Sequence, residues 1–372
     1  MSTVSMILVL GLMIGVFPGE LVFESLSSNS MDAEFADLDG DGDLDLVVAG
    51  EFAPNSVFEA TEGGFVATEF PSSNSDSEDI AIADFNGDGH LDLVFAAEDN
   101  RRSELFTGTG SLRFTGPLHP FPEATSNAVI ALDANGDGRP DLLFGNAGQN
   151  LLLLGDGLGG FVDETGNRLP ARVDITQDVE AADIDGDGDL DLVFANEDDN
   201  RILRNDGRGS FSDIEARCLP LRDGTEETRE ADFGDVDGDG DLDLFFANVD
   251  FREAGSGRNR LLLNDGSGCF TDASADWITR PSRKSLDVDW VDVNADGRLD
   301  VILANFEGVE VLINRPEGLV AETGRRLSDR SHVPAVDVEA IVIDGELHVF
   351  IANFQGADRL LPTGNFTEES DS

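Results

Sequence analysis

A nine-residue acidic segment recurs six times along the chain, and its spacing constrains the fold more than any other feature. Successive copies begin 47, 49, 50, 52 and 57 residues apart, at Asp37, Asp84, Asp133, Asp183, Asp235 and Asp292. A seventh unit, VDVEAIVIDGELHVFIAN from Val336, keeps the flanking apolar segments but shortens the acidic segment to IDGE at 343–346. Fixed periods of roughly 20 to 50 residues are typical of solenoids, propellers and repeat arrays. The chain therefore consists of seven similar units.

Each unit has the pattern of four short strands. An alternating segment such as DVEAAD (178–183) precedes the acidic segment, and an apolar run such as LDLVFAN (190–196) follows it. The next stretch, NRILRNDGRGSF (200–211), contains an Asn-Asp-Gly turn between two strands. Four antiparallel strands in each of seven repeats predict an all-β protein, a seven-bladed β-propeller.

We expect a single propeller domain at 20–365. Its units lie near 32–70, 79–118, 127–165, 178–215, 230–274, 287–322 and 337–365, followed by a tail at 366–372. Two segments compete to complete the last blade: an amino-terminal strand at 21–26 and FTEES at 366–370.

The amino terminus carries an apolar run of twelve residues, MILVLGLMIGVF at 6–17. This length suits the core of a secretory signal and is too short to cross a bilayer, although the preceding MSTVS lacks Lys and Arg. We expect a signal peptide at 1–19, no membrane span, and a secreted, periplasmic or cell-surface protein.

The charge balance restricts the partners. The chain has 24 basic and 76 acidic residues, a formal net charge of −52, and Lys284 is its only lysine. Nucleic acids and anionic membranes are bound through clustered Lys and Arg, so neither is expected as a partner. The acidity favours cations, a calcium-rich medium or a cationic ligand. A monomer is expected.

Two cysteines, Cys218 and Cys269, allow at most one disulfide. Their number and spacing indicate neither a disulfide framework nor a zinc site, so two unpaired cysteines are expected.

The acidic segments have the donor spacing of a calcium loop. Side-chain oxygens stand at positions 1, 3, 5 and 9, a glycine stands at position 6, and position 7 can offer its backbone carbonyl. Hard oxygen donors around a tight bend suit Ca²⁺, whereas Mg²⁺ requires a small octahedron and retains its waters. About six Ca²⁺ ions are predicted. The candidate side-chain ligands are Asp37, Asp39, Asp41 and Asp45; Asp84, Asn86, Asp88 and Asp92; Asp133, Asn135, Asp137 and Asp141; Asp183, Asp185, Asp187 and Asp191; Asp235, Asp237, Asp239 and Asp243; and Asp292, Asn294, Asp296 and Asp300. The candidate carbonyl donors are Asp43, His90, Arg139, Asp189, Asp241 and Arg298.

Two alternatives compete with calcium-binding propeller loops. An EF-hand needs an acid at position 12, which is apolar in all six copies, Val48 in the first and Phe95 in the second. The other alternative is an Asp/Gly turn without metal. Three loops have Asn at position 3, namely those with Asn86, Asn135 and Asn294, and we expect weaker binding there because ligand charge sets affinity.

The motif DxDGDGxxDL, followed by VFAN and NDGxGxF, resembles the FG-GAP/VCBS repeat family, whose blades are similar to those of the integrin alpha-subunit propeller. The resemblance covers roughly 21–365, and it implies Ca²⁺ in the hairpin between the first and second strands of a blade. It implies no single function, because such propellers occur in adhesins, lectin-like binders, receptors and accessory domains of enzymes.

The innermost strands also carry acids near their beginnings, at the end opposite the acidic loops. These candidates for a ligand face are Asp32, Glu34, Asp178, Glu180, Glu230, Asp232, Asp287, Asp289, Asp337 and Glu339. A hydrated channel, or acids that accept hydrogen bonds from neighbouring backbone amides, is the alternative. Phe52, Phe306 and Phe354 are candidates for an apolar rim on the same face or for core residues. Asn196, Asn248, Asn305 and Asn353 are expected to be turn residues.

Catalytic motifs are absent from the sequence: it has no nucleophile elbow, zinc-protease motif, phosphate-binding loop or dinucleotide-binding glycine pattern. We therefore expect no enzyme but a calcium-stabilised binding or adhesion module for a protein or glycan ligand. The alternatives are a carbohydrate-active lyase or hydrolase at the acidic channel mouth, a lectin-like binder, and a scaffold without a small ligand.

Overall fold

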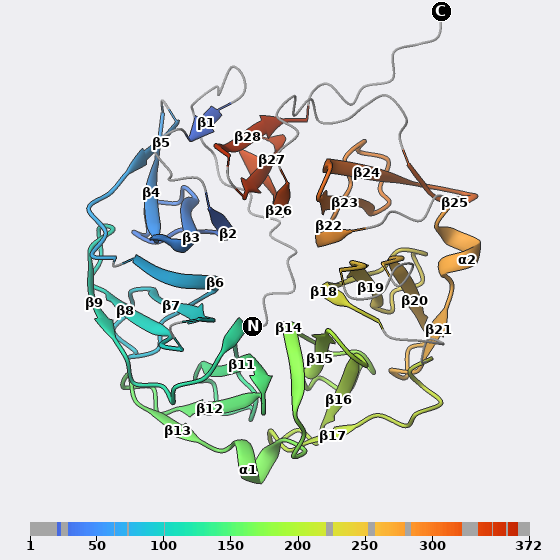
Figure 1. Cartoon of the computed structure of the whole chain (residues 1–372), viewed down its shortest axis with the longest axis horizontal. Coiled ribbons are helices and arrows are strands. Elements are labelled where there is room, and N and C mark those ends of the chain that lie inside the picture. Colours follow the sequence, from blue (N-terminus) through green and yellow to red (C-terminus); the bar gives the residue numbers. More distant parts are fainter. Residues whose placement is uncertain are drawn as a thin grey trace, which may run out of the picture.

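The computed structural model is a ring of seven four-stranded antiparallel blades around a central axis (Figure 1). The structure describes residues 21–23, 29–62, 64–72, 74–99, 101–220, 226–251, 257–279, 284–321, 334–343, 345–354 and 356–363. The expected signal peptide at 1–19 and tail at 366–372 lie outside these residues. The expected all-β propeller is confirmed.

Each blade contains four strands, which lie side by side in order from the axis to the periphery. The innermost strands are β2 (Ser30–Ala36), β6 (Asn74–Ala83), β10 (Ser126–Leu132), β14 (Asp174–Ala182), β18 (Thr228–Gly234), β22 (Ser285–Val291) and β26 (Ala335–Ile343). The second strands are β3 (Asp45–Pro54), β7 (Asp92–Ala97), β11 (Asp141–Gly148), β15 (Asp191–Asn196), β19 (Asp243–Asn248), β23 (Asp300–Asn305) and β27 (Glu346–Asn353). The third strands are β4 (Ser56–Thr61), β8 (Glu104–Gly108), β12 (Leu151–Gly155), β16 (Arg201–Asn205), β20 (Arg260–Asn264), β24 (Gly308–Arg315) and β28 (Asp358–Pro362).

The outer strands are β5 (Gly64–Ala67), β9 (Phe114–Leu118), β13 (Phe161–Asp163), β17 (Phe211–Asp213), β21 (Phe270–Asp272), β25 (Gly318–Ala321) and β1 (Leu21–Phe23). Two single-turn helices, α1 (Thr165–Arg168) and α2 (Ser274–Trp277), follow the outer strands of blades 3 and 5. Within the described ranges, no helix has the length and apolar character needed to cross a membrane.

The amino-terminal strand closes the ring. β1 pairs antiparallel with β28, with Leu21 opposite Leu360 and Phe23 opposite Asp358, so that the seventh blade combines the two ends of the described chain. Of the two segments that competed for this place, 21–26 contains the strand, and 366–370 lies outside the described residues.

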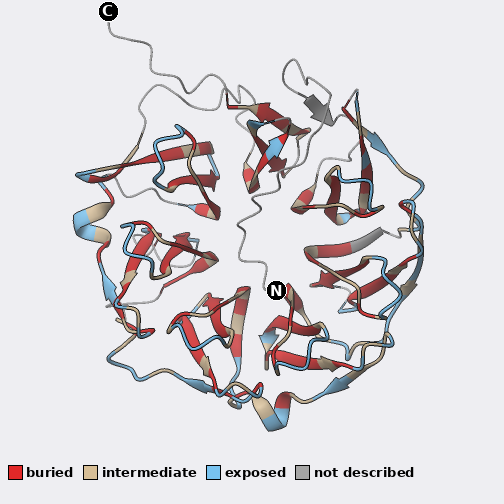
Figure 2. Ribbon diagram, turned by 180° about the vertical axis from the view of Figure 1, so that it is seen from behind, coloured by how far each residue is buried: buried red, intermediate tan, exposed pale blue. Residues whose placement is uncertain are grey.

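The core lies between the blades and is built around their second strands. In β7, β15, β19 and β23 all six residues are buried, because both faces of these strands pack against neighbouring blades (Figure 2). Phe245 of β19 lies edge to face against Trp290 of β22 in the next blade, with ring centroids 5.9 Å apart. Continuous apolar runs such as LVF and LFF are typical of such doubly covered strands.

Cys218 and Cys269 form a disulfide, so the expectation of two unpaired cysteines is wrong. Cys218 follows the outer strand of blade 4, and Cys269 immediately precedes the outer strand of blade 5. The backbone N–H of Phe270 donates to the carbonyl of Cys218 at 2.8 Å, which brings the two cysteines together. Residues 51 apart in sequence thus become neighbours through the repeat itself. Disulfides are typical of oxidising compartments.

Candidate metal loops and an acidic central channel

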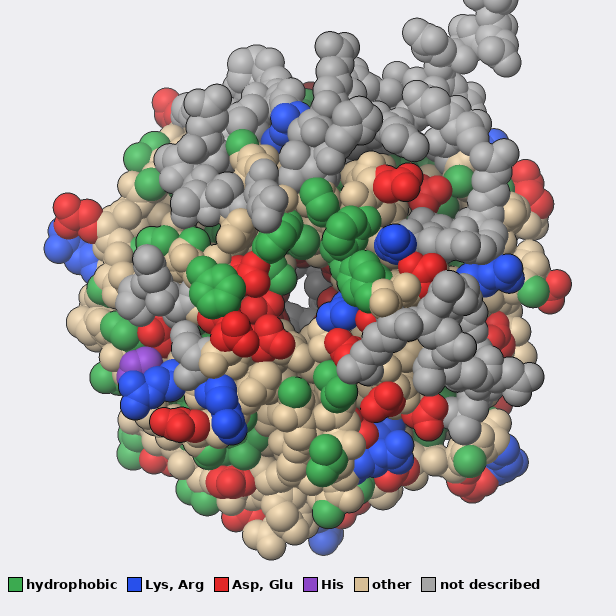
Figure 3. Space-filling view, viewed as in Figure 1, with side chains coloured by type: hydrophobic (Ala, Val, Ile, Leu, Met, Phe, Trp, Pro, Cys, Tyr) green, Lys and Arg blue, Asp and Glu red, His purple; other side chains and the backbone are tan. Residues whose placement is uncertain are grey.

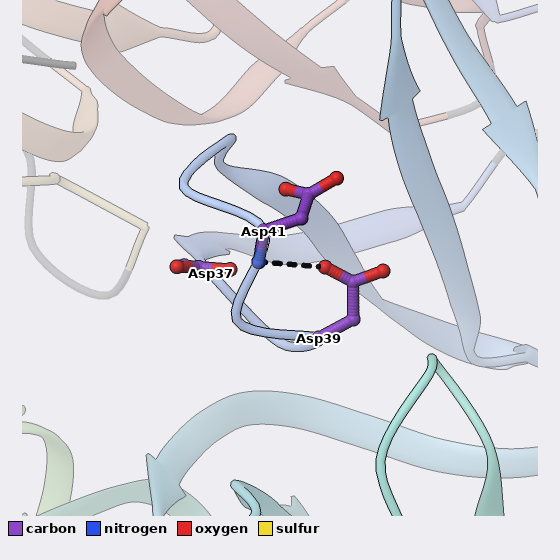
Figure 4. Close-up of side chains that lie close together, drawn as sticks. All are labelled: Asp37, Asp39 and Asp41. Carbon is purple, nitrogen blue, oxygen red and sulfur yellow. Dashed lines mark hydrogen bonds between the residues drawn. The ribbon is translucent and has the colours of Figure 1, made fainter.

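Six of the seven blades join their first two strands through an acidic loop. In blade 1, Asp37, Asp39 and Asp41 surround one point, and an oxygen of each lies within 4.8 Å of an oxygen of the others (Figure 4). Asp183, Asp185 and Asp187 form the same cluster in blade 4. The structure thus gathers the residues predicted at positions 1, 3 and 5.

Hydrogen bonds within the loop fix this geometry. Asp37 accepts from the backbone N–H groups of Gly40 at 2.8 Å and Gly42 at 3.2 Å. The amide of Asp41 donates to Asp39 at 3.2 Å, the bond drawn in Figure 4. Position 4 requires a left-handed backbone, which glycine adopts without strain; in blade 6 Ala295 takes this conformation at φ 59°. The bend is therefore retained even where glycine is replaced.

The aspartates at position 9 have a structural role that the sequence analysis missed. Asp45 is buried, and its two oxygens accept from the backbone N–H of Leu38 at 3.1 Å and of Ala60 in the third strand at 2.9 Å. Burial raises the pKa of Asp45 to about 7. Equivalent pairs of bonds are formed by Asp92, Asp141, Asp243 and Asp300. These carboxylates attach the loop to the blade whether or not they also bind a cation.

In the three loops with Asn at position 3, the Asn side chain replaces a carboxylate and contacts the aspartate at position 9. Asn86 donates its amide to Asp92 at 3.2 Å, and Asn135 and Asn294 approach Asp141 and Asp300 at 3.4 Å. In blade 6, the Arg298 guanidinium at position 7 lies 2.5 Å from Asp296. The all-aspartate loops have an acid at position 7 instead, so they accumulate more uncompensated charge.

The oxygens of the blade 4 loop show whether its residues suit a bound cation. Asp185 is ion-paired through one oxygen with Arg204 at 3.1 Å, whereas its other oxygen is buried without a hydrogen-bond donor. One oxygen of Asp191 is also buried without a donor. Oxygens that are neither solvated nor hydrogen-bonded are strong candidates for metal ligands, and the donor set is that of a hard divalent cation. The residues present therefore fit such an ion.

Asparagines near the ends of three third strands connect the acidic loops of blades 3, 4 and 5 to the next blade. Asn205, Asn264 and Asn314 donate to the backbone carbonyls of Ala134, Ile184 and Val236, which occupy position 2 of the preceding blade's loop. For Asn205 and Asn264 the Asn-Asp-Gly sequence of the hairpin turn was the available signal, whereas Asn314 is followed by Arg-Pro.

Acids on the innermost strands line the channel, as expected for the ten candidates on β2, β14, β18, β22 and β26. Asp79 of β6 is an eleventh, which the sequence analysis missed. All eleven line one cavity of about 410 Å³. Blade 3 interrupts the ring, because Ala128 and Ile130 occupy the register positions of Asp178 and Glu180.

Several channel acids accept hydrogen bonds from the neighbouring blade, which supports the alternative considered for them. Asp178 accepts from the amide of Ala231 at 3.0 Å, and Asp287 accepts from that of Val338 at 2.7 Å. Each innermost strand has one edge without a neighbouring strand along most of its length, which leaves backbone N–H groups toward the channel. The carboxylates accept hydrogen bonds from some of these N–H groups. The same carboxylates therefore join successive blades.

Burial of so many carboxyl groups raises their pKa values. Burial and then the charge of Asp79 raise the pKa of Asp32 well above its usual value. Burial also raises the pKa of Asp79, to about 6, against the opposing effect of the two backbone N–H groups that Asp79 accepts. Burial raises the pKa of Glu34 and of Asp178 to about 8. Near neutral pH, the channel therefore holds protonated and ionised carboxyl groups side by side.

The channel mouth is rimmed by aromatic and charged side chains, on the face opposite the metal loops. Acidic side chains gather beside the central opening in Figure 3. Phe52, Phe251 and Phe306 are 59%, 47% and 43% exposed, and Phe354 is only partly buried. Phe251 contacts Phe306, and the Arg229 guanidinium lies 5.4 Å from the Phe251 ring centroid. Phe251 was not among the residues expected at the rim.

The asparagines that end the second strands are the last strand residues and not turn residues, so that expectation is wrong. Asn196 is fully buried, accepts from the Thr176 hydroxyl at 2.8 Å and donates to the carbonyl of Asp199 at 2.9 Å. Asn248 and Asn305 form the matching hydroxyl bonds in their blades. None of these three residues lines the channel cavity.

Comparisons with known proteins agree with the architecture. The structure is similar to BBS1N in complex with ARL6DN, at 12% identity and a TM-score of 0.59, covering 95% of this chain and 97% of that one. It is also similar to YCF48 bound to D1 peptide, at 9% identity and a TM-score of 0.57, covering 94% and 97% of the two chains. A comparison with curated protein sequences gave no significant match.

The repeat family described as FG-GAP-like matches five overlapping segments, at residues 37–95, 84–144, 133–194, 183–246 and 235–303. Each segment runs from one acidic loop to the apolar strand that follows the next loop. These matches span most of the propeller, and the chain belongs to the FG-GAP-like repeat family.

Proposed function

We propose that this protein is a calcium-stabilised extracellular binding module whose ligand surface is the channel mouth. The observation that carries the proposal is the combination of exposed aromatic side chains with an acidic cavity on one face of a rigid ring. Exposed aromatic groups provide apolar contact area, and the carboxylates favour cationic or polyhydroxylated groups. A protein segment with basic side chains, or a glycan, has this chemistry.

Calcium is proposed for the six acidic loops. Positions 1, 3 and 5 supply carboxylate or amide oxygens, and the bound ions offset the repulsion between neighbouring aspartates. Because Asn205, Asn264 and Asn314 join each of three loops to the next blade, ions bound there also stiffen the contacts between blades. The ligand face is then held in one shape.

Two further observations support an extracellular binding role. The Cys218–Cys269 disulfide is typical of proteins that are secreted, periplasmic or displayed on a cell surface. The two similar structures, BBS1N and YCF48, were each determined with a bound partner, ARL6DN and D1 peptide respectively. Their low sequence identity transfers no partner to this chain, but both illustrate propellers that bind other molecules.

A carbohydrate-active lyase or hydrolase is the second candidate. It is favoured by the different pKa values of neighbouring carboxyl groups, about 8 for Glu34 and about 6 for Asp79. A glycosidase uses such a pair, one protonated as the general acid and one ionised as the base or nucleophile. The backbone bonds of Asp178 and Asp287 argue for a structural use of these acids instead. Incubation with acidic and neutral polysaccharides distinguishes the two candidates. Formation of cleavage products would show an enzyme and reject the proposal of a pure binding module.

The binding proposal is tested on glycan and basic-peptide arrays with and without Ca²⁺. We expect retention of at least one ligand class in Ca²⁺, and at least tenfold weaker binding by the Phe52→Ala, Phe251→Ala variant. Leu158→Ala removes an exposed apolar side chain from a glycine turn on the opposite face and serves as the matched control. Equal binding by all three proteins, or no binding to any array, would refute the proposed surface.

A further inference from the structure

Two acids face each other where blade 1 meets blade 2. β3 extends past its own blade and pairs with the start of β6, with Glu51 directly opposite Asp76. The equivalent extension of β11 onto β14 places Ala147 opposite Ile175. Like charges directly opposite each other destabilise an antiparallel pair, whereas an apolar pair does not. The blade 1–2 junction therefore contains a local conflict that the same fold avoids at the blade 3–4 junction.

Three more carboxylates surround this pair. Glu78 stands two residues after Asp76 on β6, and oxygens of Glu51, Asp76 and Glu78 lie within 4.8 Å of one another. Glu98 and Asp99 follow β7, and their oxygens lie equally close to an oxygen of Asp76. Asp76 is thus shared by two groups of three acids.

Asp76 has one oxygen with no hydrogen-bond donor. Its side chain is only 2% exposed. One oxygen accepts from the backbone N–H of Asp99 at 2.7 Å, while the other is buried without a partner. A buried carboxylate oxygen without a donor is costly unless a positive group reaches it.

We propose that Glu51, Asp76 and Glu78, together with Glu98 and Asp99, bind a divalent cation at the channel mouth, separate from the repeat loops. The chemistry is that of a calcium-like ion, because carboxylate oxygens on both sides of a shared carboxylate suit a hard cation with six to eight ligands. These residues lie outside the acidic motif. The family motif therefore does not predict this site.

The electrostatics of the cluster agree with this assignment. Burial, followed by the charges of Glu98 and Asp76, raises the pKa of Glu78 to about 9. Burial and then the charge of Asp76 raise the pKa of Glu51. Arg229 acts on Glu98 from across the mouth, but it also forms ion pairs with Glu197 at 3.2 Å and Glu227 at 3.1 Å. A bound divalent ion would supply positive charge to all five carboxylates, whereas Arg229 acts on Glu98.

The local backbone also directs the acid toward the cluster. The register shifts between Glu51 and Ala53, and Phe52 between them adopts a positive φ of 52°. This bulge turns Phe52 outward, where it is 59% exposed, and leaves Glu51 paired with Asp76. An aromatic rim residue is thereby held next to the proposed ion.

The test counts Ca²⁺ bound to the full chain after chelation and dialysis, by calorimetric titration. The Glu51→Ala, Asp76→Ile variant installs the pair found at the blade 3–4 junction and is expected to bind one Ca²⁺ fewer than the unmodified protein. The control is Glu197→Gln, the blade 4 equivalent of Glu98. The backbone N–H groups of Glu98 and Glu197 donate to the carbonyls of Asp76 and Ile175, which occupy equivalent positions of β6 and β14. This control is expected to bind the same number of ions as the unmodified protein.

An unchanged Ca²⁺ count in the double variant, or an equal loss in Glu197→Gln, would overturn the proposal. If the double variant does not fold, the isosteric Glu78→Gln and Glu98→Gln variants replace it. We then expect at least tenfold weaker binding at one site, with an unchanged circular dichroism spectrum. Unaltered affinities in both variants would likewise overturn the assignment.

Discussion

The side-chain amide of Asn264, at the end of β20, donates to the backbone carbonyl of Ile184 at 2.8 Å and to that of Leu242 at 3.1 Å. Ile184 belongs to the acidic loop of blade 4, and Leu242 belongs to that of blade 5. One buried amide therefore holds two candidate metal loops in register. Asn205 makes the corresponding pair of bonds one blade earlier.

Replacing Asn264 by Ala should destabilise the protein more than an ordinary loss of one side chain. Two buried carbonyls lose their donor, and an unpaired buried polar group costs about 1–3 kcal/mol. Chemical denaturation in Ca²⁺ measures the change. Asn167→Ala, which removes an exposed amide that bonds Glu164, is the matched control. Equal stability of the two variants would show that the bonds between loops contribute nothing.

Changing Asp39 to Asn should convert the first loop into the type found in blades 2, 3 and 6. We expect weaker Ca²⁺ binding at one site because a ligand charge is lost. In excess chelator we expect a higher unfolding temperature, because repulsion between Asp39 and Asp41 is removed. Calcium titration measures the change in affinity, and thermal unfolding in chelator measures the change in unfolding temperature. The reverse change, Asn135→Asp, should reverse both effects, and the same sign in the two variants would contradict the interpretation.

The repeat made most of the fold predictable. Alternating apolar residues before Asp183 and the continuous apolar run after Asp191 reflect a strand covered on one side and a strand covered on both. In the acidic loop of blade 4, backbone N–H groups of the same loop bind the carboxylates at positions 1 and 5, which fixes the loop geometry that the spacing predicted. Local sequence determines local geometry in each of these cases.

Contacts between units were less predictable. Cys218 lies after the outer strand of blade 4, and Cys269 lies before the outer strand of blade 5. They become neighbours because of how these two blades pack, which the sequence pattern of a single repeat does not specify. Asp79 was overlooked because its partner position on β6 holds Ala81, so the paired-acid pattern was incomplete. Glu51 meets Asp76 through an extension of β3 onto the next blade, which among the described second strands only β11 repeats, with Ala147 opposite Ile175. Such features depend on tertiary register rather than on residue pattern.

The acidic channel should make the metal-free protein less stable as pH rises. In the unfolded chain these carboxyl groups lose their protons near pH 4, whereas Glu34 and Asp178 keep theirs to about pH 8 and Asp287 to about pH 7. The folded state therefore binds more protons between about pH 4 and pH 8, and the free energy of unfolding falls across this window.

Thermal unfolding in chelator, at constant ionic strength, measures this pH dependence. The unfolding temperature should decrease from about pH 5 to pH 8. Glu34→Gln should flatten the decrease, and Glu59→Gln at an exposed position of β4 should leave it unchanged. A stability that rises with pH would show that the channel acids are ionised in the folded protein.

The disulfide should contribute to stability without being required for the fold. It closes a loop between residues 51 apart, for which loop-closure entropy gives about 4 kcal/mol. The bond from Phe270 N–H to the Cys218 carbonyl remains when both sulfurs are removed. The Cys218→Ser, Cys269→Ser variant should therefore fold with an unchanged circular dichroism spectrum and a lower denaturation midpoint. Reductant should lower the midpoint of the unmodified protein to a similar value and leave the variant unaffected. Equal midpoints before and after reduction would mean that the blade interface alone maintains the contact between blades 4 and 5.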